Sequence, residues 1–325
     1  MTFEKILVTG AGGQIGSELV PYLSEVFGND RVIPSDVRSN SSDNRFISLD
    51  VTDRAAVDLA MDKYKIDTVF HLAAILSASG EKNPELAYRV NIAGLYNIFE
   101  SALKNRSKLV MTPSSIGVFG PDTPRENVPI ETITRPVTMY GITKLMAEYL
   151  GNYYHARFGL NARGLRFPGL ISYKTPPGGG TTDYSIEMIR EAVKGKNYVC
   201  FLKEDSKLPM MYMPDALQSL LKLAEADDSR LKHRTDFNIT SFSITPKQLE
   251  AELRKHYKSF EVTYSPDFRQ RIADSWPGSL DVSAAVQEWD FHPNYDLRAT
   301  TEDMIVNLGG KIRTRESNFL EAANR

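Results

Sequence analysis

A glycine-rich turn near the N-terminus constrains the fold of this chain more than any other feature. Gly10, Gly13 and Gly16 follow an apolar run at residues 5–9 and open an amphipathic stretch over residues 14–27. A strand that turns sharply into a helix in this way presents backbone N–H groups to phosphate, and the missing Cβ atoms let a pyrophosphate approach. The motif therefore predicts a dinucleotide site, although a glycine turn used only for packing is the alternative. The expected contacts are Gly10, Gly13, Gln14, Ile15 and Gly16.

Strand and helix patterns alternate through the first half of the chain. Apolar runs predict strands at 5–9, 31–35, 46–49, 68–72, 108–112 and 161–167. Amphipathic stretches predict helices over 14–27, from a cap at Asp53, from Pro84 to Leu103, and over 138–158. This alternation predicts an α/β fold with a Rossmann-type, doubly wound parallel sheet that helices cover on both faces.

A breaker-rich loop at residues 175–183 divides the chain. We predict a dinucleotide-binding domain over residues 1–171 and a smaller α/β substrate lobe over 172–325, from which some segments return to the Rossmann sheet. The lobe has an irregular order of elements, and such a lobe usually supplies substrate specificity. Its helices are expected from Ser185, Asp215 and Thr245, and its strands at 198–202, 237–240 and 261–264. The polar residues from Gly309 onward are expected to fray.

Composition narrows the class of function. A formal net charge of −2 supplies no basic field, so nucleic acid is not an expected partner. The single cysteine, Cys200, excludes an intramolecular disulfide, and the five scattered histidines suggest no metal site. The first strand begins at once, without a basic leader or a membrane-length apolar run. We therefore expect a cytoplasmic protein that acts on a small molecule and binds neither a membrane nor a metal.

The end of the second strand indicates which dinucleotide is bound. Asp36 lies twenty residues after Gly16, where a carboxylate accepts both adenosine ribose hydroxyls and repels a 2′-phosphate. This favours NAD over NADP. Arg38 leaves two possibilities open, because its guanidinium could tolerate the phosphate or simply cover the adenine.

Further cofactor contacts are expected at the ends of the third and fourth strands. Asp50 and Val51 lie where they could contact the adenine, and a run of small residues could let the backbone pass under a ribose. His71 lies in the apolar run of the fourth strand, and it is interpreted as a core histidine rather than a ligand. The small run consists of Leu72, Ala73 and Ala74.

The predicted helix over 138–158 carries the chemistry. Tyr140 and Lys144 are four residues apart, so they share one helix face about 6 Å apart along the axis. A tyrosine pKa of about 10 is too high for a base at neutral pH, but a nearby ammonium and a positively charged nicotinamide both favour the phenolate. Ser115, at the end of the fifth strand, could orient a substrate hydroxyl toward Tyr140. The alternative for the pair is an exposed amphipathic helix face.

Together these motifs resemble the extended short-chain dehydrogenase/reductases over nearly the whole chain. The resemblance implies a seven-stranded Rossmann sheet and a homodimer packed through the helices near 84–103 and 138–158. It implies that Tyr140 is the base, that Lys144 lowers its pKa and binds the nicotinamide ribose, and that Asn91 shapes the site. Leu170 is expected among the cofactor contacts. The motifs that carry the resemblance are Gly10, Gly13 and Gly16, Asp36, Asp50 and Val51, residues 71–74, Asn91, Ser115, Tyr140 and Lys144.

The chain departs from the family members that act on nucleotide-linked sugars. Those enzymes carry Arg-x-Phe-Asn after the sixth strand, whereas this chain has Pro168 in place of the asparagine. Three stretches, at residues 76–81, 177–184 and 274–281, instead resemble the short-chain type of L-threonine dehydrogenase. That resemblance implies NAD-dependent oxidation of the secondary alcohol of L-threonine to 2-amino-3-ketobutyrate, without a metal.

The same resemblance implies how substrate is held. Ser77, Thr181 and Thr182 would bind the carboxylate or ammonium, Trp276 would close over the substrate, and residues 178–180 would form a mobile lid. Trp276 could instead be a core residue, and either threonine could be a helix cap. Two other functions remain open, a nucleotide-sugar epimerase or dehydratase and a non-enzymatic dinucleotide sensor.

Overall fold

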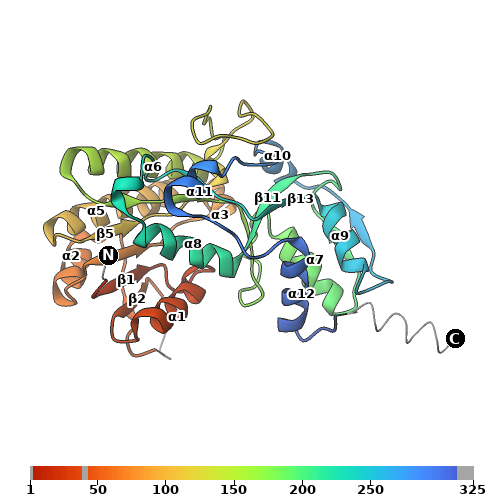
Figure 1. The fold of residues 1–325 in the computed structure, drawn as a ribbon, viewed down its shortest axis with the longest axis horizontal. Coiled ribbons are helices and arrows are strands. Elements are labelled where there is room, and N and C mark those ends of the chain that lie inside the picture. The colour runs from red at the N-terminus through yellow and green to blue at the C-terminus, as the bar shows by residue number, and fades with distance from the viewer. Residues whose placement is uncertain (1–2, 39–42, 313–325) are drawn as a thin grey trace.

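Six parallel strands form the central sheet of the computed structural model, which describes residues 3–38 and 43–312 (Figure 1). Their order is β3-β2-β1-β4-β5-β7, so the direction of strand addition reverses between β1 and β4. Ligands of doubly wound sheets bind where the order reverses, beyond the carboxyl ends of the strands. The strands are β1 (Ile6–Thr9), β2 (Val32–Asp36), β3 (Ile47–Ser48), β4 (Thr68–His71), β5 (Leu109–Met111) and β7 (Ala162–Arg163).

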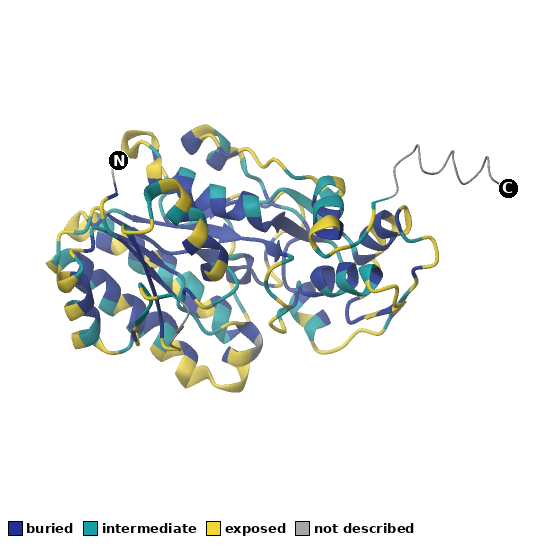
Figure 2. Cartoon of the chain, turned by 90° about the horizontal axis from the view of Figure 1, so that it is seen from below, coloured by how far each residue is buried: buried dark blue, intermediate teal, exposed yellow. Residues whose placement is uncertain are grey.

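Helices cover both faces of this sheet, as the strand–helix alternation predicts. Successive side chains of a strand point to opposite faces. In β1, Ile6 and Val8 therefore join the core beneath one helical layer, while Leu7 joins the core beneath the other. The strands form a buried layer between helices whose outer sides are exposed (Figure 2). One layer contains α1 (Gly16–Phe27), α8 (Met213–Glu225) and α11 (Ser283–Trp289), and the other α2 (Arg54–Lys63), α5 (Leu95–Lys104) and α6 (Met139–Phe158).

The predicted strand at 161–167 is two strands, which corrects the sequence analysis. It breaks at Gly164, where a Cβ atom would lie 2.4 Å from the Thr112 carbonyl oxygen. Beyond the break, β8 (Leu165–Phe167) lies between β6 (Ser114–Ser115) and β12 (Phe237–Asn238) in a separate three-stranded sheet. The expected seven-stranded sheet is thus wrong in form, since the described residues place six strands in one sheet and β12 in the next.

The predicted helix from Pro84 to Leu103 is also interrupted. It consists of α4 (Pro84–Tyr88), a π-helical segment (Arg89–Gly94) and α5. Gly94 lies so close to Val51 that a Cβ atom would approach the valine Cγ2 to 2.7 Å. Single π-helical turns inside helices frequently occur at functional sites. Here the turn contains Asn91.

Helix caps lie where the sequence predicts helix starts. Asp53 accepts a hydrogen bond from the Ala56 N–H (3.0 Å), and Asn83 and Thr138 cap α4 and α6 in the same way. Thr245 forms a capping box with Gln248 at the start of α9 (Pro246–Arg254). Each cap satisfies backbone donors that have no partner within the helix.

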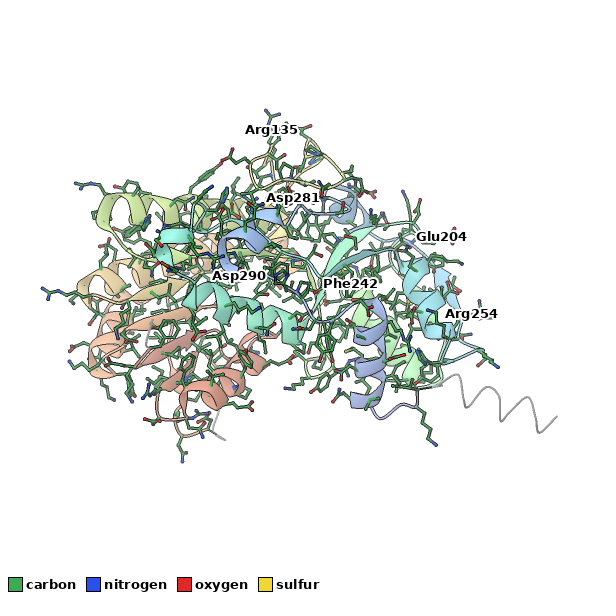
Figure 3. The ribbon with its side chains drawn as sticks, viewed as in Figure 1. Arg135, Glu204, Phe242, Arg254, Asp281 and Asp290 are labelled. Atoms are coloured by element: carbon green, nitrogen blue, oxygen red, sulfur yellow. The ribbon has the colours of Figure 1, made fainter. Side chains whose placement is uncertain are left out.

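We call the six-stranded sheet with its helices the first body. A second body packs around an apolar core of its own. One of its sheets has the order β13-β11-β9 and the other pairs β10 with β14. Glu204 and Arg254 lie at its outer end (Figure 3), where they pair with Lys247 and Glu250 of α9 at 3.5 and 3.8 Å. The strands are β9 (Gly169–Ile171), β10 (Tyr198–Cys200), β11 (Leu208–Tyr212), β13 (Phe242–Ile244) and β14 (Val262–Tyr264), and the further helices are α7 (Tyr184–Val193), α10 (Arg269–Asp274) and α12 (Leu297–Asn307).

Some segments of the second half of the chain lie against the first body. α8 packs on α1 and β5, and β12 pairs with β8. The domain boundary between residues 171 and 172 stays a prediction, and most of the segment expected to fray from Gly309 lies outside the described residues. Among the helices of the described ranges, none is long and apolar enough to cross a membrane.

Candidate active site

The glycine turn packs directly on the end of β4. Gly10 has a positive φ of 69°, and a Cβ atom there would lie 2.6 Å from the Ala73 nitrogen. At Gly16 a Cβ atom would lie 2.3 Å from the Gly10 carbonyl oxygen, whereas at Gly13 the same distance would be 3.2 Å. α1 begins at Gly16 without a side-chain cap. Ser17, Glu18 and Leu19 donate their N–H groups to the carbonyls of Gly13 and Ile15, so a pyrophosphate would meet the N–H groups of the turn that precedes them.

The predicted ribose ligand lies beside this turn. Asp36 is buried, and its carboxylate accepts hydrogen bonds from the backbone N–H groups of Gly12 (3.1 Å) and Arg38 (3.2 Å). The Arg38 side chain is 78% exposed and its Nε lies 3.8 Å from the carboxylate. The acidic group is therefore oriented by the turn that it adjoins, and the guanidinium remains accessible beside it.

The other expected cofactor contacts differ in their surroundings. Asp50 is exposed and accepts hydrogen bonds from the N–H and hydroxyl of Thr52, both at 2.8 Å. Val51 is buried against the π-helical segment, and Leu170 is buried in β9. Ala73 donates its N–H to the Thr9 hydroxyl at 3.4 Å. Leu72 and Ala74 are half-buried, as are Gln14 and Ile15 in the glycine turn.

His71 occupies a core position, as expected. It is 6% exposed, and its Nδ1 lies 2.8 Å from the Thr9 hydroxyl. Burial lowers the pKa of His71 to about 3, so the imidazole is neutral at physiological pH. Together with Asn91 and Lys144 it lines a small cavity at the carboxyl end of β4.

The three residues predicted to carry catalysis converge between β6 and α6. Gly117 and Gly141 permit this approach, because a Cβ atom at Gly117 would lie 3.2 Å from the Tyr140 ring and one at Gly141 would lie 2.1 Å from the Gly117 carbonyl oxygen. Tyr140 and Ser115 thereby both lie against Gly117, since a Cβ atom there would also lie 3.5 Å from the Ser115 hydroxyl oxygen. Lys144 donates to the Pro113 carbonyl at 2.7 Å, and its Nζ lies 5.8 Å from the centre of the Tyr140 ring.

The charge state of this cluster is set mainly by burial. Burial raises the pKa of Tyr140 above its ordinary value, and the hydrogen bond with Ser115 opposes the rise. Burial lowers the pKa of Lys144 to about 8, and the carboxylate of Glu148 opposes the fall. The lowering of the Tyr140 pKa that we expected from Lys144 stays a prediction. The positive charge of a bound nicotinamide would also favour the phenolate.

Asn91 connects the site to its supports. Its side-chain oxygen accepts from the Ile75 N–H at 2.8 Å, and its amide nitrogen donates to the Ile75 carbonyl at 3.1 Å and to the Thr143 hydroxyl at 2.9 Å. Thr143 precedes Lys144 on α6. Asn91 therefore ties the loop after β4 to the helix that carries the predicted base.

The expected substrate residues lie on both bodies. Ser77 is buried at the start of α3 (Ser77–Lys82), a helix that adjoins α6 through a 2.7 Å hydrogen bond from the Met139 N–H to Glu81. Thr181 is 2% exposed, and its hydroxyl has no partner among the described residues. Thr182 packs against β9, since a Cβ atom at Gly169 would lie 2.7 Å from its methyl group.

The threonines before α7 and Trp276 differ in how they fit their alternative, structural roles. Neither threonine caps α7, because its N-cap residue is Asp183. Trp276 is 6% exposed and packs in the core of the second body, a position that fits the core interpretation. Its role in closing over a substrate stays a prediction.

Sequence reasoning missed two groups near the site. The buried carboxylate of Asp183 accepts from the N–H groups of Gly179 (2.8 Å) and Gly180 (2.7 Å), and so it orders the predicted lid. Glu148 forms a buried ion pair with Arg166 at 2.8 Å. The spacing of Glu148, four residues after Lys144 on one helix face, is the sequence signal that could have indicated it. Within the described ranges, no three His, Cys, Asp or Glu side chains are grouped to hold a metal ion.

Three solved structures resemble this chain along almost its whole length. The L-threonine dehydrogenase of Clostridium difficile is 47% identical with a TM-score of 0.92, covering 95% of this chain and 98% of its own. The GalE-like L-threonine dehydrogenase of Cupriavidus necator, in its holo form, is 44% identical with a TM-score of 0.92, covering 94% and 99%. A monomeric L-threonine 3-dehydrogenase of metagenomic origin is 45% identical with a TM-score of 0.90, covering 93% and 98%.

Sequence comparison reaches the same family. An uncharacterised epimerase/dehydratase of Staphylococcus haemolyticus is 46% identical over 318 residues, which are 96% of this chain and 100% of the relative. Residues 6–240 match the NAD dependent epimerase/dehydratase family. The glycine turn, the acidic residue after β2 and the fold agree with a nicotinamide dinucleotide enzyme. The chain belongs to the NAD dependent epimerase/dehydratase family, the extended short-chain dehydrogenase/reductases that its motifs resemble.

Proposed function

We propose that this protein is an NAD-dependent L-threonine dehydrogenase that oxidises the β-carbon alcohol to 2-amino-3-ketobutyrate. The observation that carries the proposal is the convergence of Ser115, Tyr140 and Lys144 between β6 and α6, where Lys144 lines a cavity with Ala73, the residue on which Gly10 packs. The likeness to three solved L-threonine dehydrogenases supports the substrate. Pro168 also argues against a nucleotide-sugar diphosphate, because it lacks the polar side chain that such substrates use.

In the proposed reaction the chain's own residues bind the alcohol and move its proton. The Ser115 hydroxyl orients the substrate oxygen toward Tyr140, and the tyrosine oxygen accepts the hydroxyl proton. Lys144, which is mostly charged at neutral pH with a pKa of about 8, favours the phenolate and would hold the nicotinamide ribose. When bound, NAD supplies the acceptor for the hydride that leaves the β-carbon.

The residues that we propose to bind the substrate have polar side chains. The Thr181 hydroxyl is buried and lacks a partner among the described residues, so a substrate carboxylate or ammonium would satisfy it. Ser77 and Thr182 are the other proposed contacts. The Asp183 carboxylate holds the backbone of Gly179 and Gly180, and it would set the position from which this glycine loop closes.

A homodimer packed through α5 and α6 is part of the proposal. These two helices and α4 carry large apolar side chains that are 41–63% exposed, a patch that supports a protein interface. The exposed residues are Tyr88, Tyr96, Ile142, Met146, Tyr149 and Tyr153.

The proposal is tested by following NADH at 340 nm with the purified protein, NAD and L-threonine. We expect turnover with L-threonine and at least tenfold less with L-serine, because one missing methyl group in an apolar contact costs roughly 1–3 kcal/mol. The rival function predicts a different pattern. Conversion of a UDP-sugar without net NADH, together with no response to L-threonine, would assign the chain to the epimerase branch.

The choice of cofactor depends on Asp36 in this proposal. Replacing Asp36 by Asn removes the charge that would repel a 2′-phosphate and weakens the acceptor for the ribose hydroxyls. We therefore expect Asp36→Asn to lower NAD affinity and to raise the NADP to NAD ratio of kcat/KM by roughly 10–100-fold, since a hydrogen bond to a charged group contributes about 1.5–3 kcal/mol. Kinetics with both cofactors measure this ratio. An unchanged ratio in a protein of unchanged thermal stability would contradict the assignment.

A further inference from the structure

A buried carboxylate lies one helical turn beyond Lys144. Glu148 is 4% exposed, and both of its oxygens accept hydrogen bonds from Arg166 of β8, from Nε at 2.9 Å and from Nη2 at 2.8 Å. The Ser114 hydroxyl donates to the same carboxylate at 2.5 Å. Bidentate contacts of this kind fix the orientation of a carboxylate as well as its charge.

The position of Ser114 connects this carboxylate to the site. Ser114 lies between Pro113, whose carbonyl accepts a hydrogen bond from the Lys144 ammonium at 2.7 Å, and Ser115, which lies with Tyr140 against Gly117. α6 therefore contacts this strand end twice, through Lys144 and through Glu148. A shift of the strand end would displace both the Lys144 acceptor and the Ser115 hydroxyl relative to Tyr140.

The charges around this cluster come from several elements. Arg166 faces Glu148 from β8, and Asp236, just before β12, also acts on both members of the pair. Lys144 is faced by Tyr140 and Glu148 on its own helix and by His71 of β4, which is neutral because its pKa is about 3. Among these groups, the Glu148 carboxylate is the one whose charge favours the ammonium form of Lys144.

Burial and charge pairing shift the pKa values of Glu148 and Lys144 in opposite directions. Burial raises the pKa of Glu148, and the Arg166 guanidinium opposes the rise. The two hydrogen bonds from the Arg166 guanidinium favour the carboxylate form of Glu148 over the neutral acid. An ionised Glu148 in turn opposes the lowering of the Lys144 pKa by burial.

We propose that Glu148 is a positioning residue for the Tyr140 and Lys144 pair. Its carboxylate joins α6 to the strand end that carries Ser115, and its negative charge keeps Lys144 in the ammonium form. The catalytic meaning of that charge rests on the proposed function, but the effect on the Lys144 amine does not.

The direct test measures the Lys144 amine in the full chain. Only the neutral amine reacts with limiting acetic anhydride, so the acetylation rate of Lys144, followed by peptide mass spectrometry between pH 6 and 9, reports its protonation. In Glu148→Gln we expect an increase of about tenfold at pH 6.5, because a unit charge one helical turn away changes the protonation equilibrium by roughly that factor. An unchanged rate in a folded variant would overturn the proposal.

Three further variants separate charge from folding. Glu148→Asp keeps the charge, so the acetylation rate of Lys144 in this variant should lie within about twofold of the rate in the unaltered chain. An acetylation rate like that of Glu148→Gln would contradict the charge effect. The double variant Glu148→Gln with Arg166→Gln removes both charges, so it tests the same prediction without an unpaired buried guanidinium. Glu250→Gln is the matched control, because Glu250 is also buried and accepts from the Tyr264 hydroxyl at 2.7 Å, but it lies on α9.

Kinetics supply a readout that a purely structural role would not change. With less Lys144 ammonium the phenolate is less favoured, so the rise of kcat/KM with pH should begin at higher pH in Glu148→Gln and return in Glu148→Asp. A change in total rate without a displaced pH profile would contradict the role in charge. If L-threonine is not turned over but the acetylation rate changes as expected, the proposed substrate fails while the Glu148 inference stands.

Discussion

Replacing Tyr140 by Phe should reduce kcat by about 10²–10⁴-fold with L-threonine and NAD, the usual contribution of a general base. The substitution removes one oxygen and leaves the ring that packs against Gly117. We therefore expect the free energy of unfolding and the Kd for NAD to change little. Steady-state kinetics at saturating NAD, with thermal unfolding and cofactor titration, measure all three quantities.

The activity should also depend on pH in a direction that identifies Tyr140 as the base. Burial raises the pKa of Tyr140, and the base acts only as the phenolate, so the activity of the unaltered protein should increase from neutral to alkaline pH. Tyr140→Phe should lose this increase. Tyr64→Phe, at the end of α2 and outside the site, is the matched control and should retain full activity. Retained activity in Tyr140→Phe would assign the base to another group.

Replacing Gly16 by Ala should weaken NAD binding by roughly 5–150-fold. The new Cβ atom would lie 2.3 Å from the Gly10 carbonyl oxygen and 2.7 Å from the Ala11 Cα, distances at which backbone must move. Overpacking of this kind costs typically 1–3 kcal/mol, and here the strain falls on the turn that would hold the pyrophosphate. Titration of the purified variant with NAD, followed by calorimetry, measures the change in Kd.

A second glycine provides the control for this substitution. Gly178 has open space around the position of a Cβ atom and no positive φ, so Gly178→Ala should leave the Kd for NAD unchanged. The comparison separates close approach at the turn from a general effect of adding a methyl group. Equal NAD affinity in Gly16→Ala and the unaltered chain would mean that this turn does not hold the cofactor.

The strands and helices that the sequence predicted well are those with strong local signals. β1 and α1 flank a glycine turn, and α2, α4, α6 and α9 begin at the caps Asp53, Asn83, Thr138 and Thr245. Caps and turns depend on residues that are close along the chain, so a single sequence contains the necessary information. The fold class followed from the alternation of such elements.

The elements that were predicted wrongly depend on contacts between distant residues. The strand at 161–167 breaks because Gly164 meets Thr112, and the helix from Pro84 is interrupted where Gly94 meets Val51. The short strands β6, β9, β11 and β13 were not predicted at all. Pairing with strands that are distant in the sequence, as β11 pairs with β9 and β13, decides whether these strands form.

In the candidate site, too, local motifs could be predicted from the sequence, whereas properties set by burial could not. The residue types and spacings at Gly10, Asp36, Tyr140 and Lys144 predicted the dinucleotide site and the acid–base pair, because each motif is contained within one short segment. The protonation of the pair was not predictable, since burial, rather than Lys144, dominates the pKa of Tyr140.

The sequence by itself therefore determined the fold class and the family, and it predicted the residues that we propose for the chemistry, because these depend on local motifs. Only the tertiary structure decided how those residues are supported. The spacing of Glu148 from Lys144 places both on one face of α6, but the contacts of Glu148 with Arg166 of β8 and Ser114 of β6 join segments that are distant in the sequence. The reason is physical: burial and charge pairing arise between segments that only the packed sheet and helices bring into contact.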